Sequence, residues 1–311
     1  MTGKGKWGVG KVLLCVFLAA AALLLLWRGV FPRLAAGQAA AQTQAWPRGE
    51  RLAANLHSTH AVLMRVQDKA ILLDKKGEDR IYPASLTKMM TALIVIEQMP
   101  NLQEKVTLDP EIFPPLYEQN ASMAGFEPGE EVSAADLLYG MMLPSGAECC
   151  TALAGRVAGS EEAFVRMMNE KAAQLHLDGT HFQNTSGLQD PDHYSTARDL
   201  AVLLEYARQN AAFSALITAQ AHATAATNLH PDGITVRSTL FQDLPDPSVP
   251  GGRILGGKTG YTDEAGLCLA SLAEVDGAAY LLVTAGAPGN HESEPYHIED
   301  ARAVYGALGE G

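Results

Sequence analysis

Strand patterns stand at both ends of the globular part of this 311-residue chain, and helical patterns fill the sequence between them. Residues 61–66 and 69–74, separated by a short polar turn, predict one β-hairpin, and residues 266–272 and 279–285 predict a second. A lone hairpin cannot bury an apolar face, so we expect the two to share one antiparallel sheet. Strands at both ends with helices between them indicate an α+β fold.

The composition of the chain supports one large domain and argues against one class of binding partner. The chain is 47% hydrophobic, which allows a sizeable core, and its net charge of −12 argues against a nucleic-acid partner. The expected helices occupy residues 84–99, 134–143, 146–158, 161–175 and 196–209, with a last one within 294–308.

The N-terminus carries the pattern of an exported protein. Lysines at 4, 6 and 11 precede an uncharged apolar run over residues 12–27, and alanines at 39–41 offer a small-residue cleavage site far beyond that run. We favour an uncleaved membrane anchor over a cleaved signal, with the basic end cytoplasmic and the enzyme outside. The expected organisation is a membrane anchor or signal segment over 1–31, a flexible linker over 32–56, and a catalytic domain over 57–311.

Ser85 and Lys88 stand three residues apart at the start of a long apolar segment that follows a proline. On a helix this spacing puts both side chains on one face, with Cβ atoms about 5–6 Å apart. A lysine can deprotonate a serine only if its own pKa is lowered, which burial and a second cation would achieve. Lys258 is our candidate for that cation. Alone, the motif more often marks a surface serine and a solvated lysine.

Two later motifs give this pair a context. Ser145 lies between two apolar helical stretches, and a serine at such a junction, taken alone, more often caps a helix. Lys258 and Thr259 follow a glycine-rich stretch and precede a buried strand pattern. The glycines around them, among them Gly260, leave room for a ligand beside the strand. Cationic Lys258 suits an anionic substrate.

In order and surroundings these motifs resemble those of the low-molecular-mass penicillin-binding proteins, specifically the serine-type D-alanyl-D-alanine carboxypeptidases. The resemblance runs from about residue 59 to about residue 285. It implies the penicillin-binding and serine β-lactamase-like transpeptidase fold, an antiparallel sheet flanked by helices with a helical insert. The stretches that carry it are residues 61–75, 83–89, 184–188, 193–201 and 257–262.

The resemblance implies a role for each motif. Ser85 would attack the carbonyl between two D-alanines of a peptidoglycan stem pentapeptide, Lys88 would be the base, and Ser145 would relay a proton to the leaving amine. β-Lactam antibiotics would acylate the same serine. The family needs no cofactor or metal ion, and none is expected here.

The substrate-binding strand would comprise Lys258, Thr259, Gly260 and Tyr261. In the family, the first two hold the terminal carboxylate and tune the base. The backbone N–H groups of Ser85 and Tyr261 would form an oxyanion hole, in which each donor is typically worth about 3–4 kcal/mol.

One position departs from the family pattern. Ala147 stands where the family has an asparagine that contacts substrate. We expect weakened or retuned carboxypeptidase activity, with D,D-endopeptidase activity and a catalytically silent wall-binding or regulatory protein as alternatives. A β-lactamase is disfavoured because no later glutamate motif is present to activate a deacylating water.

The remaining reactive residues have structural interpretations. Cys149, Cys150 and Cys268 lie in apolar runs without metal-ligand spacing, so we expect small buried side chains, no disulfide and no zinc. We expect His193 to pack the turn before a helix capped by Ser195, and a role for this histidine in a cleft stays open.

Overall fold

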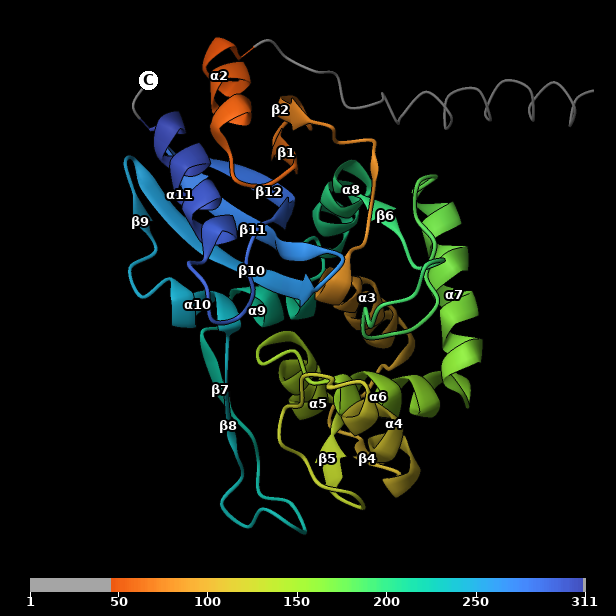
Figure 1. Cartoon of the computed structure of the whole chain (residues 1–311). Coiled ribbons are helices and arrows are strands. Elements are labelled where there is room, and N and C mark those ends of the chain that lie inside the picture. The colour runs from red at the N-terminus through yellow and green to blue at the C-terminus, as the bar shows by residue number, and fades with distance from the viewer. Residues whose placement is uncertain (1–45, 310–311) are drawn as a thin grey trace, which may run out of the picture. The chain divides into compact units, whose positions relative to one another are not determined.

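One six-stranded antiparallel sheet, in the order β2-β1-β12-β11-β10-β9, organises the computed structural model, which describes residues 46–309 (Figure 1). The first strand pairs with the last along its whole length, with Leu63 opposite Leu282. The two predicted hairpins therefore share a sheet, and the α+β expectation is confirmed. The strands are β1 (His60–Arg65), β2 (Ile71–Lys75), β9 (Ser248–Val249), β10 (Gly252–Thr262), β11 (Gly266–Val275) and β12 (Ala278–Ala287).

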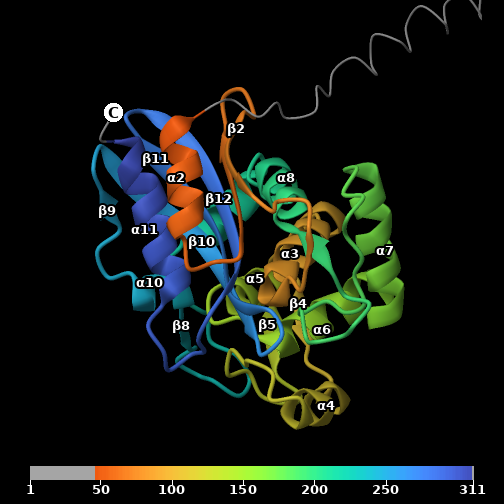
Figure 2. The same ribbon diagram turned by 45° about the horizontal axis from the view of Figure 1, so that its top comes forward.

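Helices cover both faces of this sheet. Helices α2 (Pro47–Asn55) and α11 (Tyr296–Leu308) pack on one face, and α8 (Ala197–Ala207) packs on the other, beside α3 (Lys88–Gln98) (Figures 1 and 2). Apolar side chains of the sheet and of α11 are buried together in the first layer, which includes Leu269, Leu282, Ile298 and Tyr305.

Helix α2 lies in the segment expected to be a flexible linker. Leu52 and Ala53 of this helix pack against the core cluster, and the Arg48 guanidinium donates a hydrogen bond to the carbonyl oxygen of Ala307, at 2.7 Å. The apolar spacing of this segment gives the helix a face to bury, so the chain joins the domain before residue 57. The expected anchor over 1–31 and the linker residues 32–45 lie outside the described residues. Among the residues described, no helix is both long enough and apolar enough to cross a bilayer.

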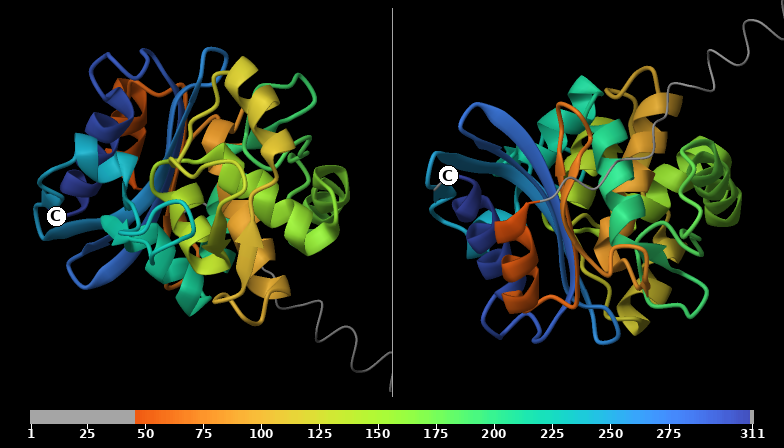
Figure 3. Two further views of the ribbon diagram at one scale, coloured as in Figure 1. Left: turned by 90° about the horizontal axis from the view of Figure 1, so that it is seen from below. Right: turned by 90° about the horizontal axis from the view of Figure 1, so that it is seen from above.

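A helical insert fills the side away from α2 and α11 (Figure 3). Four of the expected middle helices, over 134–143, 146–158, 161–175 and 196–209, form within about two residues of their predicted bounds, whereas the one expected over 84–99 becomes α-helical only at Lys88. Helix α8 is capped by Thr196, whose side chain accepts a hydrogen bond from the Asp199 N–H, so Ser195 is not the cap. The other helices are α4 (Phe113–Glu118), α5 (Ala134–Met142), α6 (Ala147–Ala158), α7 (Glu161–Gln174), α9 (Ala211–Thr218) and α10 (Thr239–Asp243).

Short strand pairs complete the insert. A hairpin formed by β7 and β8 projects from the molecule and is fastened to it by two histidine–carboxylate pairs (Figure 1). His222 contacts Asp136 at 2.7 Å, and His230 contacts the fully buried Glu130 at 2.8 Å. The short strands are β3 (Arg80–Ile81), β4 (Lys105–Thr107), β5 (Glu131–Ser133), β6 (Ser195–Thr196), β7 (Ala221–Ala223) and β8 (Thr235–Arg237).

The link between α11 and the sheet can be tested through one hydroxyl. Tyr305 is fully buried, and its hydroxyl donates a hydrogen bond to the Ser271 carbonyl oxygen at 3.0 Å. We expect Tyr305→Phe to lower the free energy of unfolding by about 1–2 kcal/mol, because Ser271 loses a buried partner. Urea denaturation measures this change. The control is Tyr117→Phe, at a side chain that is 56% exposed, and an equal loss in both variants would contradict the assignment.

Candidate active site

Ser85 lies in a strained turn at the start of α3. The predicted helix over 84–99 begins as a single 3-10 turn, η2 (Ala84–Thr87), in which Ala84 has a φ of +45°. Such a φ is unfavourable for a residue with a Cβ and persists only where the surroundings enforce it. Gly187 lies against this turn, since a Cβ there would stand 1.8 Å from the Ala84 carbonyl oxygen. The close approach therefore requires glycine at 187.

Lys88 connects the serine to that same loop. Its Nζ lies 3.0 Å from Ser85 Oγ and 2.6 Å from the carbonyl oxygen of Ser186. The side chain is buried, and this burial lowers the pKa of Lys88, while Cys150 and Glu148 act in the opposite direction. The amine thus has a carbonyl acceptor on one side and the serine hydroxyl on the other.

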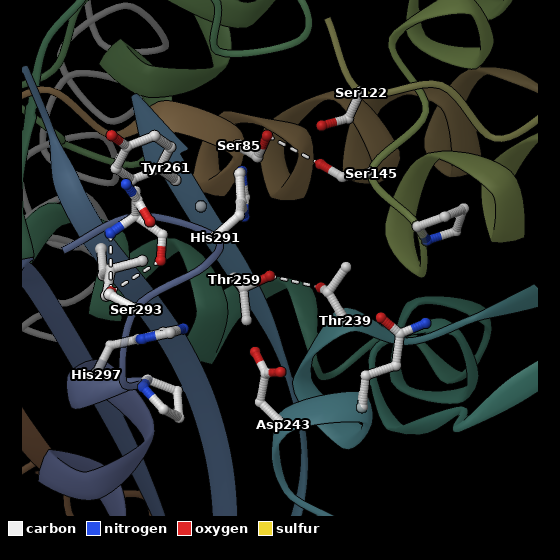
Figure 4. Close-up of a pocket in the computed structure, with 16 residues that line it drawn as sticks. Ser85, Ser122, Ser145, Thr239, Asp243, Thr259, Tyr261, His291, Ser293 and His297 are labelled. Carbon is white, nitrogen blue, oxygen red and sulfur yellow. Dashed lines mark hydrogen bonds between the residues drawn. The ribbon is translucent and has the colours of Figure 1, made fainter. Parts of the chain in front are cut away.

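Ser145 approaches the serine from the insert. Its Oγ donates a hydrogen bond to Ser85 Oγ, at 2.9 Å (Figure 4). Gly146 occupies the N-cap position of α6, so Ser145 does not cap this helix. The backbone of Ser145 has a φ of +71°, a second strained residue beside Ser85.

Lys258 belongs to β10, and its side chain is buried, with Nζ 2.7 Å from the carbonyl oxygen of Thr259. The pKa of Lys258 lies well below its ordinary value. The main cause is burial of the side chain, and the nearby charge of Lys88 is a smaller cause. Lys88 therefore disfavours the charged form of Lys258. Neither of them lines the pocket in front of Ser85.

Strand β10 forms one wall of that pocket, which has a volume of about 250 Å³. Thr259 Oγ1 lies 2.5 Å from Thr239 Oγ1 of α10, and the two hydroxyls share a hydrogen bond. Gly260 faces the turn η2 that carries Ser85, since a Cβ there would lie 3.0 Å from the Ser85 backbone nitrogen. The lining side chains include Ser85, Ser145, Thr259 and Tyr261 of the expected site, together with Ser122, Thr239, Asp243, His291, Ser293 and His297 (Figure 4).

Sequence patterns gave no indication of this second group of lining residues. Ser122 lies in the loop between α4 and β5, Thr239 and Asp243 are the first and last residues of α10, and His291 lies in a loop before α11. Only the tertiary fold brings them to Ser85. Within residues 46–309, no group of three histidine, cysteine, aspartate or glutamate side chains is arranged to hold a metal ion.

His193 contacts Thr87, the last residue of the turn η2 that carries Ser85. Its Nδ1 accepts a hydrogen bond from the Gln183 N–H at 3.1 Å, so Nε2 carries the proton and donates to Thr87 Oγ1 at 2.7 Å. The histidine is buried and does not line the pocket. Its burial agrees with the expectation that His193 packs the turn before α8. The histidine takes no part in lining the pocket.

The three cysteines of the described region are buried free thiols. Burial raises the pKa of Cys150 and of Cys268 to about 12, and raises that of Cys149 well above its ordinary value. They pack as small apolar side chains.

Comparison with known proteins identifies relatives of this arrangement. A family model described as D-alanyl-D-alanine carboxypeptidase matches residues 45–289. The chain is 32% identical over 240 residues to the D-alanyl-D-alanine carboxypeptidase DacF of Bacillus subtilis, covering 73% of this chain and 57% of that protein. It is 37% identical over 150 residues to DacC of Escherichia coli, covering 46% of this chain and 37% of that one. The chain thus spans about half the length of these relatives, or less.

Solved structures confirm the expected fold. A variant of the Streptomyces K15 DD-transpeptidase superposes with a TM-score of 0.73 at 29% identity, covering 81% of this chain and 98% of that one. Penicillin binding protein 5 of Haemophilus influenzae gives a TM-score of 0.69 at 26% identity, covering 81% of this chain and 70% of that protein.

The buried state of His193 predicts a pH dependence of stability. Burial lowers the pKa of His193 from 6.5 to about 4, so the unfolded chain binds this proton more tightly. Stability should therefore fall as the pH drops from 6.5 to 4, by up to about 3 kcal/mol for this group. The pKa of buried His297, also about 4, adds a similar effect.

We expect His193→Gln to flatten this pH dependence, because Gln cannot titrate and keeps an N–H for Thr87. Unfolding free energies at pH 5 and pH 7.5 give the comparison, with exposed His176→Gln as the control. An unchanged pH dependence in His193→Gln would show that this imidazole titrates normally in the folded protein.

Proposed function

The chain belongs to the D-alanyl-D-alanine carboxypeptidase family of serine peptidases, and from this premise we propose that it removes the terminal D-alanine of peptidoglycan stem pentapeptides through an acyl-enzyme on Ser85. One observation carries the proposal above the others. Ser85 Oγ lies within hydrogen-bond distance of both Lys88 Nζ, at 3.0 Å, and Ser145 Oγ, at 2.9 Å. Nucleophile, base and proton relay are thus in contact before any substrate binds.

Acylation begins with the buried amine of Lys88. A neutral amine donates one N–H to the Ser186 carbonyl and keeps its lone pair for the Ser85 proton. Ser85 Oγ then bonds to the carbonyl carbon between the two D-alanines. The proton passes from Lys88 through Ser145 to the amide nitrogen, the C–N bond breaks, and D-alanine leaves with its amine.

Deacylation reverses these roles with water as the nucleophile. Water attacks the ester carbonyl and gives a proton to the relay, Ser85 Oγ leaves and is reprotonated, and the shortened peptide departs as a carboxylate. During both steps the carbonyl oxygen would accept hydrogen bonds from the backbone N–H groups of Ser85 and Tyr261. The contact of Gly260 with the Ser85 backbone supports this pairing.

Substrate binding depends on β10. The Thr259 and Thr239 hydroxyls share one hydrogen bond, which leaves one hydroxyl proton to donate to the terminal carboxylate of the substrate. Lys258, held on the Thr259 carbonyl behind the pocket, would support Thr259 in this recognition without itself lining the pocket. The same pocket would receive the carboxylate of a β-lactam antibiotic, which acylates Ser85.

The N-terminal residues complete the proposal. Basic residues before an apolar run over 12–27 favour an uncleaved anchor, which would keep the enzyme on the outer face of the cytoplasmic membrane, next to its substrate. The mass of the protein extracted from cell envelopes tests this point. A mature chain that begins after the alanines at 39–41 would show a secreted form instead.

Ser85→Ala should reduce D-alanine release by about three orders of magnitude or more, because it removes the hydroxyl that contacts Lys88 Nζ. The assay measures D-alanine released from diacetyl-Lys-D-Ala-D-Ala. Exposed Ser248→Ala, on β9, is the matched control and should retain full activity. Labelled penicillin and mass spectrometry should locate the adduct on Ser85 in the parent protein.

Labelling of Ser85→Ala at the parental rate would overturn the assignment. Binding of penicillin without D-alanine release would favour a silent wall-binding protein, and cleavage of cross-linked muropeptides without release from pentapeptides would favour a D,D-endopeptidase.

Ser145→Ala tests the relay separately. Loss of one acid–base group commonly costs 10²–10⁴-fold in rate, and we expect a loss of about 10²-fold in kcat with little change in KM. Steady-state kinetics on the same peptide provide both constants. An unchanged kcat would remove Ser145 from the proton path.

A further inference from the structure

We propose that the Ser122 hydroxyl hydrogen-bonds the substrate peptide group that precedes the scissile bond, in place of the amide side chain that Ala147 lacks. This inference rests on the proposed function and names a residue that determines how the acyl part of the substrate is held.

Ser122, and not residue 147, forms the wall of the pocket beside Ser145. Ala147 is 1% exposed and does not line the pocket, whereas Ser122 is exposed and does. The Ala147 N–H donates a hydrogen bond to the Ser122 carbonyl oxygen, at 2.8 Å, so the Ser122 loop lies directly over the start of α6. Residue 147 is therefore buried next to this loop.

The Ser122 hydroxyl is free to take a ligand. In Figure 4 it points to the same side as the Ser85–Ser145 pair. Within the part of the chain that the structure describes, its oxygen has no hydrogen-bond partner, unlike Ser145 Oγ. A hydroxyl can accept as well as donate, and the bond inferred here is the one in which the Ser122 oxygen accepts from the peptide N–H, the group that an ester lacks.

A buried carboxylate holds the loop in this position. Glu148 is fully buried, and its Oε1 accepts hydrogen bonds from the N–H groups of Ala124 at 2.6 Å and Gly125 at 3.1 Å. A Cβ at Gly146 would come within 2.6 Å of the Ala124 Cβ, so the loop and the start of α6 are in tight contact. Farther along, Glu130 bonds Thr227 and His230 of the β7–β8 hairpin. The hydroxyl is thus presented by a fixed segment, which lowers the cost of ordering it on binding.

The position of Ser122 determines which part of the substrate it meets. In Figure 4, Ser122 lies above the Ser85–Ser145 pair, and Thr259 and Thr239 lie below it. If the terminal carboxylate binds at Thr259, the chain on the acyl side of the scissile bond passes Ser122. The nearest polar group there is the peptide group before the scissile one.

A double-mutant cycle between enzyme and substrate tests this contact. The substrates are diacetyl-Lys-D-Ala-D-Ala and its analogue with D-lactate as the middle residue, in which an ester replaces the peptide group before the intact scissile amide. We expect Ser122→Ala to lower kcat/KM about tenfold for the peptide and no more than about twofold for the ester analogue. Ser122→Thr keeps the hydroxyl and should stay within about threefold of the parent, and Ser248→Ala is the unaffected control.

Each outcome decides the matter. An equal loss on both substrates, or no loss on the peptide, overturns the contact and leaves the carboxypeptidase activity of the parent intact. A parent protein that releases no D-alanine from either substrate overturns the proposed function, and this inference with it.

Discussion

The burial of one lysine is the constraint on which the rest of this site depends. Lys88 is 2% exposed, and a charged ammonium in such a place is costly unless it is well partnered. Its contacts are the Ser186 carbonyl and the Ser85 hydroxyl, which satisfy a neutral amine. Placing this amine inside the protein lowers its pKa, which is the property that the proposed base needs.

The loop that follows α7 provides the acceptor. Asn184 Oδ1 accepts hydrogen bonds from the Gly187 N–H at 2.7 Å and the Ser186 N–H at 3.2 Å, which fixes the carbonyl oxygen of Ser186 toward Lys88. Thr185 is tied to Glu161 at the start of α7 through both its N–H and its hydroxyl. Gly187 lets the same loop touch the Ala84 carbonyl. One segment thus holds the Lys88 amine and confines the strained turn that carries Ser85, so the two are positioned together.

Local patterns predicted most of the fold and the centre of the site. The strands of the sheet and the principal helices follow apolar periods of two and 3.6, which act over a few residues. Ser85 and Lys88 lie three apart on one helical turn, so their contact was also a local prediction. The helix α2 was missed because its apolar face is short and its partners, β2 and α11, are distant in sequence.

The remainder of the site could not come from local patterns. Ser122, Thr239 and His291 meet Ser85 only because the insert and the end of the sheet close around one pocket. The alternatives for Ser145 were both reasonable in sequence terms, since a serine before a helix commonly caps it. Only the left-handed backbone of Ser145 turns its hydroxyl toward Ser85 instead. In the sequence, Ala147 indicated only that the family's asparagine side chain is missing. The structure adds that residue 147 is buried and that its N–H bonds the Ser122 carbonyl oxygen.

The rate of acylation by a penicillin, measured in single turnovers from pH 6 to pH 11, tests the central claim most directly. If buried Lys88 takes the Ser85 proton as a neutral amine, the rate should rise with pH through one ionisation and level off below pH 10.5, the ordinary pKa of lysine. A rate that begins to rise only near 10.5, or that does not depend on pH, would show that Lys88 is not the base.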